Sequence, residues 1–148
     1  MKRNSRLSLA LHTLSHMAGD PGRVRTSAEI AKHAGTNPVV VRRVLGRLRE
    51  AGLLASEKGH AGGWRLARAP HAVTLADVYL ALDDRLVASP HDSDAFDCSV
   101  ENALQSRVAL ILEDVEHSLG EKLGTSSLSD VHGFDKHWDC ACCAEGTA

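Results

Sequence analysis

The residues with the clearest chemical potential in this sequence are its four cysteines, which fall into two groups. Cys98 stands alone, directly before a long stretch of apolar residues at helical spacing. A thiol at a helix N-terminus gains from the positive end of the helix dipole, which lowers its pKa and favours the thiolate. Acidic neighbours oppose this effect, so the sign of the shift stays open at this stage. Cys98 is therefore a candidate sensor of oxidation or alkylation, and the alternative is a small buried residue at a helix start.

The other three cysteines, Cys140, Cys142 and Cys143, lie near the end of the chain beside His137 and Asp139. Such a run could bind zinc or copper(I), but ligands so close in sequence do not easily reach one tetrahedral centre. It could also supply a thiol that resolves an oxidised Cys98. We favour a disordered tail over both alternatives.

Lysine and arginine supply a second kind of chemistry, and they are unevenly distributed along the 148 residues. Residues 1–70 contain 13 Lys and Arg against 4 Asp and Glu, and residues 71–148 contain 4 against 15, although the net charge is only −2. A basic half of this kind favours a polyanionic partner. The two Trp, two Phe and one Tyr leave few rings for base stacking, so duplex DNA is favoured over single strands or RNA.

Three helices are expected in the basic half. Apolar residues at helical spacing predict a helix over residues 7–18. The capping box Thr26-Ser27-Ala28-Glu29 begins a second helix that ends at Gly35, and Asn37 caps a third helix that runs to Gly52. The second and third helices, joined by a three-residue turn, have the pattern of a helix-turn-helix.

On the third helix, four apolar residues repeat at the spacing of one helical face and predict its buried side: Val41, Val44, Leu45 and Leu48. At about 100° per residue, the opposite side carries Val39, Arg43 and Arg47, with Arg42 and Arg49 on its flanks. These arginines could form an ordinary solvated face. Their position on the second helix of a helix-turn-helix favours contact with DNA.

A β-hairpin is expected next, with strands over residues 53–56 and 64–67 joined by the glycine-rich segment 57–63. A hairpin that directly follows a recognition helix is a wing, and small residues at its tip allow close approach to the DNA backbone or minor groove. Its charge comes from Lys58, His60, Arg65 and Arg68. The alternative is a flexible surface loop.

The capping box Thr74-Leu75-Ala76-Asp77 begins a fourth helix, which an acidic loop follows. From Val100 onward, apolar residues keep helical spacing for about six turns, or about 35 Å. The domain is too small to cover this helix. We therefore expect the apolar side of the helix to pair with the same side of a second subunit, through Leu104, Val108, Ile111, Val115 and Leu119. The expected organisation is a DNA-binding domain (1–84), an acidic sensor loop (85–99), a dimerisation helix (100–124) and a partly flexible C-terminal segment (125–148).

The features that carry a family resemblance are Ser27-Ala28-Glu29-Ile30-Ala31, Asn37-Pro38-Val39-Val40-Val41-Arg42-Arg43 and residues 48–53, 59–68 and 73–78. In this order they resemble the Rrf-two (Rrf2) family of bacterial transcription regulators, over about residues 1–131. The resemblance implies a mainly α fold, a winged helix-turn-helix domain with a small β-hairpin wing and a long C-terminal dimerisation helix.

The resemblance also implies a homodimer that binds a partly palindromic operator in duplex DNA, usually as a repressor. The DNA-contacting residues would be Ser27, Asn37, Pro38, Val39, Arg42, Arg43, Arg47, Lys58, His60, Gly62 and Arg65. Within this set, Arg43 is favoured for a bidentate contact with guanine and Arg42 or Arg47 for phosphate.

Many members of this family hold an iron–sulfur cluster through three closely spaced cysteines before the dimer helix. Residues 86–104 contain Cys98 alone, among carboxylates that are poor cluster ligands. The chain is therefore similar to the single-cysteine subgroup, and no resident cofactor is expected. An iron–sulfur or other metal-sensing regulator of the same family stays as the alternative.

Other classes of protein are less well supported. No glycine fingerprint opens a helix, and no nucleophilic triad or carboxylate pair stands out, so an enzyme is not expected. No run of about 18 apolar residues exists, and the N-terminal segment is too polar for an export signal, so the expected location is the cytoplasm. A winged-helix protein-interaction module would leave the basic half without its obvious partner.

Overall fold

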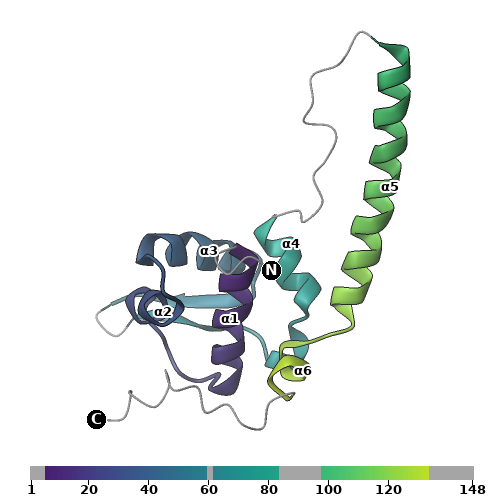
Figure 1. Ribbon diagram of the computed structural model, residues 1–148. Coiled ribbons are helices and arrows are strands. Elements are labelled where there is room, and N and C mark those ends of the chain that lie inside the picture. The colour runs from purple at the N-terminus through teal and green to yellow at the C-terminus, as the bar shows by residue number, and fades with distance from the viewer. Residues whose placement is uncertain (1–5, 60–61, 84–97, 134–148) are drawn as a thin grey trace.

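The computed structural model describes residues 6–59, 62–83 and 98–133 (Figure 1). His60, the acidic loop before Cys98 and the cysteines at 140, 142 and 143 lie outside these ranges. The elements in chain order are α1 (Arg6–Gly19), α2 (Ser27–Ala34), α3 (Pro38–Glu50), β1 (Leu54–Glu57), β2 (Gly63–Leu66), η1 (Pro70–Ala72), α4 (Leu75–Leu82), α5 (Ser99–Gly124) and α6 (Leu128–Gly133).

The caps of the helix-turn-helix are those that the sequence predicts. Thr26 Oγ1 accepts a hydrogen bond from the Glu29 backbone N–H at 3.2 Å, and Glu29 Oε2 accepts one from the Thr26 N–H at 2.7 Å. Gly35 ends α2 in the left-handed region, with φ of 62°. Asn37 Oδ1 then accepts from the Val39 N–H at 2.8 Å and begins α3. These local bonds set the angle between the two helices.

The buried side of α3 lies at the centre of the hydrophobic core. Its four predicted core residues, Val41, Val44, Leu45 and Leu48, are at most 1% exposed. They pack among α1 and α4, which contribute Leu14, Met17, Val78 and Leu82 to the same core. Because burial of one such side chain stabilises the fold by about 1.5–3 kcal/mol, this packing fixes the rotation of α3 about its axis.

The wing is an antiparallel pair of strands in which Leu54 lies opposite Leu66. Both strands are displaced by one residue from the predicted ranges, β1 toward the C-terminus and β2 toward the N-terminus. The Leu53 N–H closes the end of α3 on the Leu48 carbonyl at 2.9 Å, so β1 begins only at the next residue. Outside the hairpin, Trp64 and Arg25 exchange two backbone hydrogen bonds of 2.9 Å. The wing is therefore joined to the segment that precedes α2.

Helix α5 projects from the compact body of the domain, and the chain returns to that body after it (Figure 1). The Tyr79 hydroxyl donates a hydrogen bond to Glu116 and links α4 to α5. The Leu75 N–H bonds Ser126 O and the Leu128 N–H bonds Val73 O, both at 2.9 Å, and the Leu128 side chain is fully buried. The sequence did not predict α6, because one buried leucine in a helix of six residues leaves no periodic signal. None of the helices described combines the length and apolar character that a bilayer crossing requires.

The close approach of the wing to Arg25 gives the first prediction. A Cβ added at Gly63 would lie 2.5 Å from the Arg25 carbonyl oxygen, so the two backbones would have to separate. We expect Gly63→Ala to lower the free energy of unfolding by about 1–3 kcal/mol, as measured by urea denaturation.

Gly46→Ala in α3 is the matched control, because nothing lies within 4 Å of a Cβ added there. This variant should be neutral or raise the stability by up to about 1 kcal/mol. A Gly63→Ala variant as stable as the wild type, or equal destabilisation by both substitutions, would contradict the explanation.

Candidate nucleic-acid interface

The outward side of α3 presents two exposed arginines in succession. Arg42 and Arg43 are both exposed, and Val39, one turn earlier, is 55% exposed although it is apolar. Pro38 is half-buried at the first helical position. Asn37 is exposed and caps α3 with its carbonyl oxygen, so its amide NH₂ group keeps its donors for an outside acceptor. The N-terminal half of α3 thus offers hydrogen-bond donors together with the exposed methyl groups of Val39 and Val40.

Arg47 and Arg49, further along α3, are engaged within the chain. Arg47 is half-buried, and its Nη1 donates to the carbonyl oxygen of Leu82 at 3.0 Å, at the end of α4. Arg49 Nη1 donates to Ser56 Oγ on β1 at 3.3 Å. Arg47 therefore joins α3 to α4, a role that its spacing on the helix did not reveal.

Ser27 and the wing are joined by a side-chain hydrogen bond. The indole Nε1–H of Trp64 donates to Ser27 Oγ at 2.9 Å, at the first position of α2. Because the hydroxyl oxygen accepts this bond, its own proton stays available to donate to an oxygen acceptor. The indole thereby orients Ser27 at the N-terminus of α2, where a helix dipole favours an anion.

The wing tip combines glycine and charge. A Cβ at Gly62 would lie 2.9 Å from the Gly59 carbonyl oxygen, so this turn accepts only glycine there. Lys58 is exposed. Arg65 on β2 pairs with Glu57 on β1 at 2.7 Å, and both side chains are about half exposed. His60, also predicted to contact DNA, lies outside the described residues.

Cys98 is exposed and its thiol is free. It occupies the N-cap of α5, where the backbone N–H groups of Glu101 and Val100 stabilise the thiolate and lower its pKa from the usual value. The neutral thiol forms no capping hydrogen bond in this geometry. The lowered pKa agrees with the effect expected of a helix N-terminus, whereas the acidic residues that precede Cys98 lie outside the described part of the chain.

An apolar stripe runs along the exposed length of α5. Four residues at helical spacing are exposed: Leu104 by 57%, Val108 by 39%, Ile111 by 53% and Val115 by 47%. Leu119, the fifth residue of the predicted interface, is partly buried and packs against the core of its own chain. The exposed stripe therefore precedes Glu116 and Leu119, residues through which α5 contacts the rest of its own chain.

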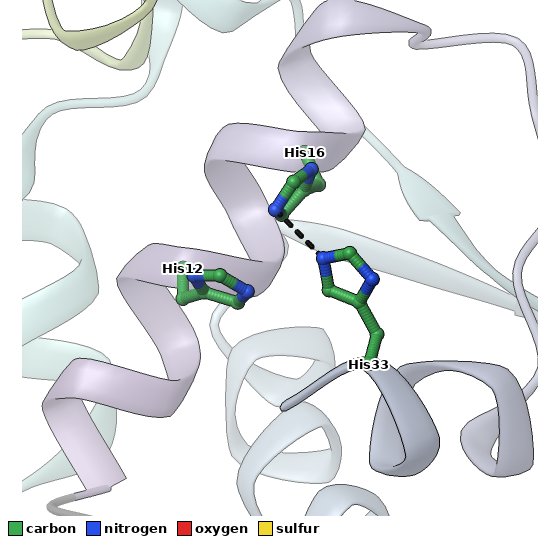
Figure 2. Close-up of side chains that lie close together, drawn as sticks. All are labelled: His12, His16 and His33. Carbon is green, nitrogen blue, oxygen red and sulfur yellow. Dashed lines mark hydrogen bonds between the residues drawn. The ribbon is translucent and has the colours of Figure 1, made fainter. Parts of the chain in front are cut away.

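Sequence analysis missed one cluster of side chains, which lies between α1 and α2. His12 and His16 are one turn apart on α1, and both rings approach that of His33 on α2 (Figure 2). Nε2 of His16 and Nε2 of His33 are 2.9 Å apart and hydrogen-bonded. The i, i+4 spacing of His12 and His16 was the available signal, whereas only the packing of α2 on α1 adds His33.

Comparison with known proteins agrees with this architecture. The profile of the Rrf2 family, described as "Iron-dependent Transcriptional regulator", matches residues 3–133. YwnA of Bacillus subtilis (strain 168), named as an HTH-type transcriptional regulator, is 35% identical over 130 residues, which cover 86% of this chain and 95% of YwnA.

Solved structures agree as well. A crystal structure described as that of a DNA binding protein shares 31% identity with a TM-score of 0.69, covering 86% of this chain and 98% of the other. The global cysteine regulator CymR (YrzC) of B. subtilis has a TM-score of 0.63 over 92% of this chain and 99% of its own, at 21% identity, so this likeness concerns the fold. The relatives named as regulators are not enzymes. With its winged helix and a family match over nearly its whole length, the chain belongs to the Rrf2 family of DNA-binding transcriptional regulators.

Proposed function

We propose that the protein is a homodimeric cytoplasmic repressor that binds a partly palindromic operator and releases it when Cys98 is modified. The observation that carries this proposal is the outward side of α3. Its exposed Arg42 and Arg43 lie opposite a core-facing side that cannot rotate without exposing Val44 and Leu45. In a helix-turn-helix this side of the second helix enters the major groove.

The contacts divide into base reading and positioning. Arg43, exposed and without the intrachain role of Arg47, is proposed to bind guanine O6 and N7 with its guanidinium fork. Val39 and Pro38 offer apolar contact to a thymine methyl group, and Asn37 offers its amide. Arg42 is proposed to bind phosphate.

Phosphate contacts from the rest of the domain would set the register on the duplex. Ser27, held by the Trp64 indole, is proposed to donate to a phosphate at the N-terminus of α2. On the wing, Lys58, His60, Gly62 and Arg65 are proposed to approach the backbone or the minor groove. Arg65 would then exchange its bond with Glu57 for one with phosphate, at little cost because the pair is exposed.

Dimerisation is proposed to bury the apolar stripe of α5 against the same stripe of a second copy. Four large apolar side chains exposed on one helix face form a patch of the kind that self-association covers. A two-fold axis through this contact would present two α3 helices to half-sites about 34–36 Å apart, one turn of DNA.

The segment before α5 does not fit a three-cysteine iron–sulfur centre. Cluster iron is held by thiolates, and residues 86–104 supply Cys98 alone. The donor set at the N-terminus of α5 instead fits thiol chemistry, because Cys98 is exposed and its pKa is lowered. In the proposed switch, the thiolate attacks a peroxide, whose O–O bond breaks to leave a sulfenic acid on Cys98 and hydroxide.

We expect Arg43→Ala to weaken operator binding by about 1–3 kcal/mol and to relax specificity at one base pair. The measurement is fluorescence anisotropy with the operator and with a set of single-base variants at fixed salt. Lys122→Ala, which removes the same charge on α5, is the control and should leave both quantities unchanged. Uniform weakening on every sequence would instead make Arg43 a phosphate contact.

We expect Ile111→Glu to convert the dimer to a folded monomer, because it places a charge in the middle of the apolar stripe. Sedimentation equilibrium reports the mass, and circular dichroism checks that the helices remain. Ser106→Glu, on the opposite side of α5, should stay dimeric. A dimer in both variants would place the interface elsewhere.

The lowered pKa of Cys98 predicts the pH dependence of its alkylation. Only the thiolate reacts, so the rate should reach half of its maximum at a lower pH in the folded protein than in urea. The variant used carries Ser at positions 140, 142 and 143, so that Cys98 is the one thiol that reacts with iodoacetamide.

Equal pH midpoints of alkylation in the folded and unfolded chain would contradict the role of the α5 amides.

The proposed switch at Cys98 is tested separately, by measuring the affinity for the operator after treatment with mild peroxide. Wild type should lose affinity and Cys98→Ser should keep it, and an equal response of the two would disprove switching at this residue.

A further inference from the structure

The proposed function does not use the three histidines that meet between α1 and α2. One ring comes from each of two successive turns of α1, and the third comes from the last turn of α2 (Figure 2). We propose that His12, His16 and His33 bind a divalent transition metal ion, with zinc the best match, and that this ion ties α1 to the helix-turn-helix.

The distances suit coordination after small movements. Potential ligand atoms of the three residues all lie within 4.8 Å of one another, and the two Nε2 atoms of His16 and His33 are 2.9 Å apart. A tetrahedral zinc ion with Zn–N bonds of 2.0–2.1 Å needs ligand nitrogens about 3.3 Å apart. The differences are small enough for ring rotations about the side-chain torsions to bring the nitrogens to this spacing.

The helices hold these rings in place before any metal arrives. The i, i+4 spacing puts His12 and His16 on one side of α1, as in other helical metal motifs. His33 is positioned by α2, whose capping box and Gly35 turn define both of its ends. A site on two rigid helices loses little conformational entropy on binding.

Metal binding has to replace the hydrogen bond between two of the rings. His16 and His33 share a hydrogen bond between their Nε2 atoms, which requires one of these atoms to carry a proton. Metal binding at both atoms requires that this proton leave to solvent or move to Nδ1 of the same ring.

The donor set selects the class of metal. Imidazole suits zinc, copper, nickel and iron, and magnesium and calcium prefer oxygen. Within the described part of the chain, this three-histidine group includes no thiol or carboxylate. Three histidines with a free fourth position form a known zinc geometry, and the exposure of His12 lets water complete it.

Metal binding at the three histidines should stabilise the folded chain, because the unfolded chain does not hold the three rings together. The experiment uses the full chain with Ser at positions 140, 142 and 143, which removes the competing thiols of the C-terminal run. Co²⁺ added to this protein should give the visible absorption of a tetrahedral site at one ion per chain, without a thiolate charge-transfer band. Zn²⁺ should displace the bound Co²⁺. At a free Zn²⁺ concentration of about one hundred times Kd, it should raise Tm by at least about 4 °C.

Substitution of the ligands decides the assignment. His12→Ala, the exposed ligand and the least disruptive change, should weaken Co²⁺ binding at least tenfold, since loss of even an outer-shell partner of a metal site costs about 10–100-fold. His33→Ala should do the same, whereas His117→Ala, an exposed histidine on α5, should bind Co²⁺ as before. Absence of saturable binding in the chain with the three serines, or binding that His12→Ala and His33→Ala both leave unchanged, would overturn the proposal.

Discussion

The burial of one side of α3 is the constraint on which the rest of this structure depends. Val41, Val44, Leu45 and Leu48 are almost completely buried, so the helix has one rotational setting in the core. That setting alone decides that Arg42 and Arg43 face solvent and that Arg47 meets the end of α4. Substitution of an exposed side chain on the outward side costs the fold little stability, so the contacts proposed for DNA can change there without a change in the core.

A second set of contacts holds the wing to the helix-turn-helix. The backbone pair between Trp64 and Arg25 and the indole bond to Ser27 both come from one residue of β2. A two-stranded hairpin by itself is marginally stable in water. Trp64 therefore gives the hairpin a third backbone partner, and its side chain sets the position of a hydroxyl at the start of α2. The wing is thus joined to the helix-turn-helix by both backbone and side-chain hydrogen bonds.

The sequence predicted those features that short-range signals specify. Capping residues and apolar spacing located α2, α3 and α4, because each signal acts within one helical turn. Contacts between segments distant in the sequence could not be predicted from it. They are the Arg47 bond to Leu82, the return of Leu128 to the core, and the contact of His33 with α1. Helical spacing placed Arg47 on the same outward side as Arg43, because the spacing carries no information about α4, which packs beside α3.

The position of α5 limits how a change near Cys98 can act on DNA binding. Its link to the domain runs through α4, where Tyr79 bonds Glu116, and α4 in turn accepts the Arg47 guanidinium at Leu82. Leu119 and Leu123 add apolar contact near the far end of α5, whereas Cys98 and the exposed stripe precede these residues along the helix. A movement of α5 would therefore reach α3 by displacing α4. Because packed helices shift as rigid units, a small rotation of α5 would change the orientation of α3 as a whole rather than of single side chains.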